Sequence, residues 1–152
     1  MATPTHVLQV FSGSWYVGPD EDEDYFEMMF RAFDEENFAA YIFSLPRPGW
    51  PDDFKAEELA KAGEIFLQAG GAPTRMTLDT RVEKHGRQSL CVVGRTPSAD
   101  TNTAPEERVK VGENEATVQP NEVFEWREAA QIFYYYYKTM TVPDGYVLRE
   151  VA

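Results

Sequence analysis

Few residues in this 152-residue sequence have the type and spacing that catalysis or metal binding requires. The two histidines, His6 and His85, lie far apart, one at the start of a predicted strand and the other in a predicted turn. They therefore give no indication of a shared catalytic or metal-binding role. The single cysteine, Cys91, rules out an internal disulfide or a cysteine-based zinc site. Its apolar neighbours favour a buried structural thiol over a reactive one.

The sequence also lacks the common motifs for nucleophiles, phosphate and calcium. The stretch FSGSWYVG has serines near glycines but not the G-x-S-x-G pattern of a nucleophile elbow. Gly70-Gly71 is predicted to end a helix, whereas a phosphate-binding loop precedes one. The acidic run at 20–24 is contiguous, without the alternating ligands and central glycine of a calcium loop. The sequence predicts no catalytic residue, no metal ligand and no cofactor, although an unrecognised hydrolase or transferase activity stays open.

The charge is strongly acidic and unevenly placed. Lysine and arginine number 14 against 26 acidic residues, which gives a net charge of −12, and residues 1–37 hold nine of the acids with one base. Such a field repels nucleic acid, which binds by releasing counterions to Lys and Arg, and attracts a basic protein. Five consecutive acids are therefore candidate partner-binding residues: Asp20, Glu21, Asp22, Glu23 and Asp24. The alternative is that they only aid solubility and favour the N-terminus of the following helix.

The totals fit one cytoplasmic domain. The N-terminal sequence MATPTHVLQV lacks the basic and apolar regions of a signal peptide. No apolar run approaches the ~20 residues that a membrane-spanning helix needs. With 43% hydrophobic residues, the chain can form a core, and its length fits a single domain. We expect one domain over residues 1–152, with no membrane partner.

The elements that position these residues follow from hydrophobic periodicity and turn signals. The predicted strands are, in chain order, 6–13 with its continuation 14–17, 38–45, 75–82, 88–93, 108–111, 115–118 and 146–151. The strand at 75–82 alternates between two sides: Met76, Leu78, Thr80 and Val82 on one, Arg75, Thr77, Asp79 and Arg81 on the other. The segment Lys84-His85-Gly86 predicts a hairpin turn, and residues 96–107 predict a flexible surface loop.

Three helices are predicted between the strands. Within 25–33, apolar residues recur at i, i+3, i+4 and i+7, which favours a helix, with a bulged strand as the alternative. A second helix begins at Asp52 or Asp53 and ends at Gly70-Gly71, and a third spans 126–138. This order, with antiparallel pairing, predicts an α+β fold. We expect a single domain with a mostly antiparallel sheet of about five to seven strands packed with two or three helices.

The third helix contains four consecutive tyrosines, which cannot all lie on one buried face. At about 100° per residue, Tyr137 falls on the apolar face, and Tyr134 and Tyr136 fall at its borders. Tyr135 falls on the opposite side, together with Glu128. Either Tyr135 packs under another element or it is displayed as an aromatic contact residue. Glu128 and Tyr135 are therefore two further candidate partner-binding residues.

The C-terminal third combines a Val-bearing strand, an E-A helix with an aromatic position, then Thr, Pro and a final strand. The residues are Val118 or Val123, Glu128-Ala129, Phe133, Thr139, Pro143 and Tyr146–Glu150. In these features the chain resembles the Imm1-type immunity proteins of bacterial polymorphic-toxin systems. Upstream, FLQAGGAPTRMTLDTRV and CVVGR look similar to central strands of actinobacterial members. The four tyrosines and the acidic segment depart from this pattern, so the subfamily and the partner stay open.

The resemblance implies a non-catalytic, immunity-protein-like domain that neutralises a cognate toxin by binding it, commonly over the active-site cleft. Toxins that act on nucleic acid often have basic clefts, where a run of carboxylates can compete for the phosphate position. The expected partner is therefore a cognate toxin with a basic cleft. The alternative is a structural or regulatory interaction module, such as a secretion adaptor or an assembly subunit.

Overall fold

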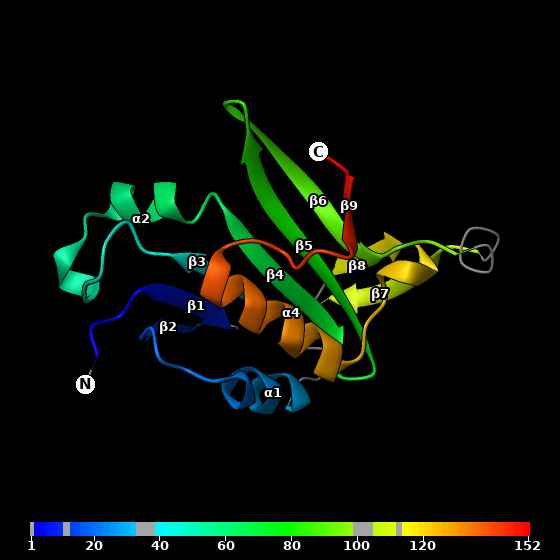
Figure 1. Ribbon diagram of the computed structural model, residues 1–152, viewed down its shortest axis with the longest axis horizontal. Coiled ribbons are helices and arrows are strands. Elements are labelled where there is room, and N and C mark those ends of the chain that lie inside the picture. Colours follow the sequence, from blue (N-terminus) through cyan, green and yellow to red (C-terminus); the bar gives the residue numbers. More distant parts are fainter. Residues whose placement is uncertain (1, 11–12, 33–38, 99–104, 112–113) are drawn as a thin grey trace.

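The computed structural model describes residues 2–10, 13–32, 39–98, 105–111 and 114–152 (Figure 1). The strands are β1 (His6–Val10), β2 (Gly13–Val17), β3 (Ala39–Ser44), β4 (Phe66–Ala72), β5 (Arg75–Lys84), β6 (Arg87–Arg95), β7 (Glu107–Val111), β8 (Asn114–Val118) and β9 (Tyr146–Glu150). The α-helices are α1 (Glu23–Arg31), α2 (Ala56–Ala62) and α4 (Trp126–Thr139), and short 3-10 helices lie at η1 (Pro51–Asp53) and η2 (Pro120–Glu122).

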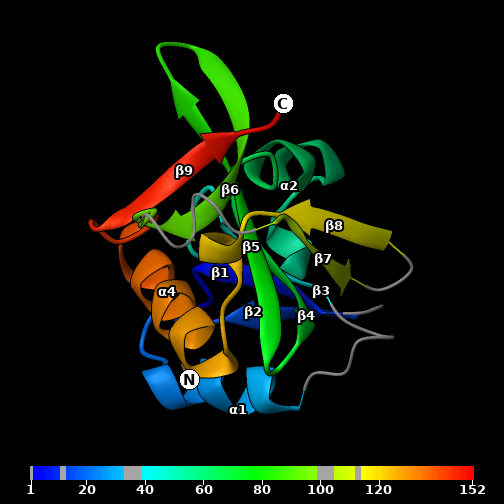
Figure 2. The same cartoon turned by 90° about the vertical axis from the view of Figure 1, so that its right-hand side faces the viewer.

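Seven strands form one sheet in the order β2-β1-β3-β4-β5-β6-β9, and every pairing is antiparallel. Strands β7 and β8 form a separate two-stranded hairpin, called here the β7–β8 hairpin, which packs against β4 and β5. Helices α1 and α4 lie side by side on one face of the sheet, and the hairpin lies on the other (Figures 1 and 2). The predicted α+β fold with a mostly antiparallel sheet is confirmed.

The larger core lies between the two helices and the sheet. Phe26 and Phe30 of α1 and Phe133 of α4 are completely buried. The rings of Phe30 and Phe133 pack edge to face, with their centres 4.9 Å apart. Side chains of the sheet complete this layer: Leu8, Val10, Ala40, Ile42, Leu67, Ala69, Met76, Leu78 and Val93. Burying one such large apolar side chain stabilises the folded state by roughly 1.5–3 kcal/mol. This layer therefore holds α1 and α4 on the sheet.

A smaller core covers the opposite face near β1, β3 and β4. It contains Val7, Phe43, Leu45 and Phe66, and the α2 region packs against it through Phe54 and Leu59. In the part of the chain that the structure describes, no helix is long and apolar enough to cross a membrane.

The N-terminal region differs from its prediction. Residues 6–17 do not form one strand with a continuation, because β1 pairs antiparallel with β2 and Val10 lies opposite Gly13. Strand β1 therefore has backbone partners on both of its edges, β2 and β3. The helix favoured for 25–33 is confirmed by α1, which begins at Glu23 and ends at Arg31, while Phe33 lies outside the described residues.

The second predicted helix is wrong at its start and over its C-terminal half. Asp52 and Asp53 lie in η1, and Lys55 is the N-cap of α2. Helix α2 ends at Ala62, and Phe66 begins strand β4, which pairs with both β3 and β5. Gly70 does not end a helix; a Cβ atom there would lie 2.3 Å from Cγ1 of Val111 in the β7–β8 hairpin. Gly71 adopts φ +111°, a conformation that favours glycine. Close approach of the hairpin, rather than helix capping, explains this glycine pair.

The other predicted elements lie close to their expected positions. The turn at His85 and Gly86 has positive φ angles of 54° and 77° and joins β5 to β6, as a tight hairpin requires. Cys91 is buried. The predicted loop at 96–107 falls partly on residues 99–104, which lie outside the described residues, so its flexibility stays a prediction.

The four tyrosines divide differently from the prediction. Tyr137 is 2% exposed, as expected, but Tyr136 is also 2% exposed instead of lying at a border. Helix α4 contacts β3, β4 and β5, so the sheet covers a wider arc of the helix than its apolar residues alone define. Tyr135 is 42% exposed and Tyr134 is half-buried.

Candidate functional site

The acidic run covers the end of the β2–α1 connection and the first turn of α1, and the backbone at its start is attached to the C-terminal end of α4. The hydroxyl of Tyr137 donates to the Gly18 carbonyl and accepts from the Glu21 backbone N–H at 3.2 Å. The Lys138 ammonium donates to the Pro19 carbonyl at 3.0 Å. These contacts hold the backbone that leads into the five acids in one place relative to α4.

The carboxylates of this run make few interactions with the rest of the protein. Asp22 caps α1, because its Oδ1 accepts from the Tyr25 backbone N–H at 3.3 Å. Glu23 and Asp24 lie in the first turn, where they complement the positive end of the helix dipole. Asp20, Asp22 and Asp24 are exposed. Among the described residues, none of the five acids forms an ion pair, so their charge is available to a partner.

Tyr135 does not join this acidic surface. It lies two residues before Tyr137, and two residues correspond to about 200° around a helix. Since Tyr137 contacts the acidic segment, Tyr135 projects from the other flank of α4. The structure thus brings the five acids together and leaves Tyr135 separate.

Glu128 is already engaged within the protein. Its Oε1 accepts from Nε of Arg95 at 3.1 Å, and its Oε2 accepts from the Tyr146 hydroxyl at 2.8 Å. The Arg95 guanidinium also lies 4.6 Å from the centre of the Phe124 ring. Burial, together with the bond to Glu128, raises the pKa of Tyr146 to about 12. Glu128 therefore fixes β6 and β9 against α4, and a partner would have to compete with these bonds.

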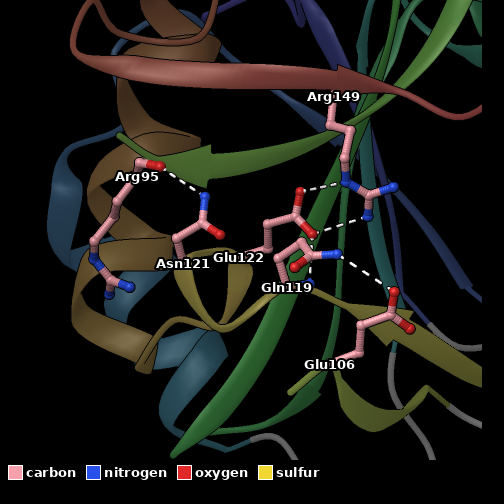
Figure 3. Close-up of polar contacts among 6 residues, drawn as sticks. All are labelled: Arg95, Glu106, Gln119, Asn121, Glu122 and Arg149. Carbon is pink, nitrogen blue, oxygen red and sulfur yellow. Dashed lines mark hydrogen bonds and ion pairs between the residues drawn. The ribbon is translucent and has the colours of Figure 1, made fainter. Parts of the chain in front are cut away.

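An ion pair between a buried carboxylate and an exposed guanidinium, which the sequence did not indicate, connects η2 to β9 (Figure 3). Glu122 is 1% exposed, and its two oxygens accept from Nε and Nη2 of Arg149, each at 2.9 Å. Oε1 also accepts from the Gln119 backbone N–H at 2.7 Å. Gly94 allows η2 to approach β6, because a Cβ there would lie 3.0 Å from Cγ of Glu122. Only the fold reveals this pair, since its partners are distant in sequence.

Beside Arg149, a cleft of about 370 Å³ lies between the sheet and the β7–β8 hairpin, and we call it the hairpin cleft. Gln68, Thr77, Asp79 and Val92 line it from the sheet. Residues of the hairpin form the facing wall: Val111, Asn114, Glu115, Ala116, Thr117 and Val118. Its volume lies in the lower part of the ~300–1,000 Å³ range of small-molecule sites.

Asp79 is the unusual residue of the hairpin cleft. It lies on the side of β5 that the sequence assigned to the more polar residues, but the β7–β8 hairpin partly buries it. Burial raises the pKa of this carboxyl to about 6, and a bond to its own backbone N–H opposes the rise. Within the described residues, no other residue donates a hydrogen bond to this carboxylate. The sequence prediction missed the site because the covering hairpin follows some thirty positions later.

Comparison with known proteins adds no assignment. No model of a known protein family matches this chain, and no solved structure matches it. Within the described part of the chain, no group of three or more His, Cys, Asp or Glu side chains could hold a metal ion. Among the described residues, the acidic run and Asp79 in the hairpin cleft present carboxylates without an ion-pair partner.

Proposed function

We propose that this protein binds a cognate toxin in the cytoplasm and neutralises it by covering a basic active-site cleft, without catalysing a reaction itself. The observation that carries the proposal is the acidic run at 20–24, five adjacent carboxylates that no described basic side chain neutralises. The resemblance of the C-terminal third to Imm1-type immunity proteins supports the same class of function. The net charge of −12 supports a basic partner.

The acidic run suits electrostatic steering. Exposed charges act over roughly 10 Å at 0.1 M salt, so they accelerate the encounter of complementary surfaces more than they slow dissociation. Tyr137 and Lys138 hold the preceding backbone, so little ordering of this segment is needed when a partner binds.

The test begins with the partner purified from the protein's own cells and assayed for toxicity with and without this protein. Association is then measured for wild type and for the variant Asp20→Asn/Glu21→Gln/Asp24→Asn, which keeps the Asp22 cap. A matched control, Asp52→Asn/Glu57→Gln/Glu83→Gln, removes the same charge from exposed acids elsewhere. We expect the first variant to associate at least about tenfold more slowly at low salt, with a flatter salt dependence.

Two results would contradict the proposal. Equal slowing by both variants would mean that only net charge matters and that the acidic run is no contact site. A captured partner whose activity is unchanged by stoichiometric complex formation would exclude neutralisation.

A second candidate function is a structural or regulatory interaction module, and strand β9 favours it. This strand ends the seven-stranded sheet, and Val147, Leu148 and the following Val151 are each more than a third exposed. A free strand edge with exposed apolar residues is a surface to which another strand can add. Partner binding that is lost in Leu148→Lys but kept in the acidic-run variant would favour this module.

A further inference from the structure

The hairpin cleft contains a negative charge with no described counter-charge beside it. Asp79 pairs in register with Gln68 of β4 on one side and with Val92 of β6 on the other. Val92 in turn pairs with Arg149 of β9. One full strand therefore separates Asp79 from the nearest cation along this row, and strands are spaced about 4.8 Å apart.

The cations around the cleft are engaged elsewhere. Arg149 forms the two-bond ion pair with Glu122. On β5 itself, Arg75 pairs with Glu107 at 2.9 Å, and the Arg81 guanidinium lies 5.7 Å from the centre of the Phe66 ring. The remaining charged group in the lining is Glu115 of β8. Its Oε1 lies 3.7 Å from Nη1 of Arg108.

The other lining groups suit a positively charged ligand with an apolar part. The Gln68 side-chain carbonyl and the Thr77 hydroxyl can accept hydrogen bonds beside the carboxylate. Leu90, Val92 and Val111 provide apolar surface along the same cleft. A carboxylate among acceptors and aliphatic side chains matches an ammonium or guanidinium on a hydrocarbon stem.

We propose that the hairpin cleft is a binding site for a small organic cation, an ammonium or guanidinium group on a short apolar stem, with Asp79 as its counter-charge. The cation supplies the hydrogen-bond donors that the carboxylate otherwise lacks, and its stem occupies the apolar part of the cleft. The β7–β8 hairpin, which lines this site, lies on the opposite face of the sheet from α1 and α4 (Figure 2), so the site does not depend on the toxin-binding proposal.

The test uses three probes: butylguanidinium, the smaller butylammonium, and the neutral butylurea, which matches butylguanidinium in size. Binding is measured by calorimetry, and the contact residues are located from amide shifts in two-dimensional NMR at pH 7.5. We expect both cations to bind saturably, with shifts centred on Gln68, Thr77 and Val92. Butylurea, which has the shape of butylguanidinium without its charge, is expected not to bind. Affinity for the cations should fall as the pH is lowered through 6, because Asp79 then becomes protonated.

Two variants test which carboxylate of the cleft is the counter-charge of the bound cation. Asp79→Asn is nearly isosteric and should weaken cation binding at least about tenfold, whereas Glu115→Gln, at the rim of the cleft, should weaken it less than about threefold. The proposal is wrong if butylurea binds as well as the cations, if Asp79→Asn binds them undiminished, or if the shifts map to residues 20–24. Absence of binding by the wild-type protein at millimolar concentrations would also refute it, whatever the variants do.

Discussion

Asp79→Asn should stabilise the protein, because the native carboxylate loses hydration without gaining a partner. The pKa of Asp79 is raised from 3.8 to about 6, and at about 1.36 kcal/mol per pKa unit the ionised form is disfavoured by roughly 3 kcal/mol at pH 7.5. A raised carboxyl pKa means that the folded protein binds the proton more tightly than the unfolded chain does. Stability therefore decreases as the pH rises from about 4 to 6 and stays level above that range. Asparagine does not ionise, so the Asp79→Asn variant does not lose this stability as the pH rises.

The assay is urea unfolding of both proteins, followed by tryptophan fluorescence, at pH 7.5 and pH 5. We expect Asp79→Asn to be more stable by up to about 3 kcal/mol at pH 7.5, which corresponds to a melting temperature higher by roughly 6–12 °C. The advantage should shrink by roughly 1.4 kcal/mol at pH 5, where most native Asp79 is protonated. Glu115→Gln is the control and should show no such pH-dependent difference. Equal stability of Asp79→Asn and wild type at pH 7.5, or a difference that is the same at both pH values, would refute the reasoning.

Three further predictions concern packing and are tested by thermal and urea unfolding. Tyr137→Ala should cost roughly 3–5 kcal/mol because its ring is 2% exposed, whereas Tyr135→Ala, at 42% exposure, should cost less than about 0.5 kcal/mol. Gly70→Ala should cost about 1–3 kcal/mol, because its Cβ would lie 2.3 Å from a hairpin side chain. Arg149→Ala should cost about 1–3 kcal/mol, because Glu122 is 1% exposed and would lose both bonds.

Matched controls separate these causes from general sensitivity to substitution. Gly18→Ala places its Cβ 3.6 Å from the nearest atom, an ordinary contact, and should be tolerated better than Gly70→Ala. Arg87→Ala removes an ion pair whose side chains are 77% and 50% exposed and should cost no more than about 1 kcal/mol. If each control lost as much stability as its partner variant, neither the close approach of the hairpin nor the burial of Glu122 would be the cause.

Sequence patterns predicted the elements whose structure depends on local periodicity. Helix α4 follows its apolar spacing, and the tight turn at Gly86 follows from its residue types. The predictions failed where a distant segment decides the outcome. Gly70-Gly71 has the composition of a helix end, but the β7–β8 hairpin determines its role. Asp79 and the Glu122–Arg149 pair were missed for the same reason, because burial there comes from strands and turns far along the chain.

The positions of the candidate partner-binding residues determine what each can contribute. The acidic run lies against the flank of α4 that carries Tyr137 and Lys138, which bond to the backbone of Glu21 and Pro19. Tyr135 projects from the other flank. Charges can act on an approaching partner across several ångströms of water. The acids can therefore raise the association rate without contacting the partner. An aromatic side chain contributes only when the partner covers it, and its loss then appears mainly in the dissociation rate. A partner that binds over the acidic flank alone would therefore be slowed by the acidic-run variant and unaffected by Tyr135→Ala. Sensitivity to both would mean that the partner spans the whole exposed width of α4.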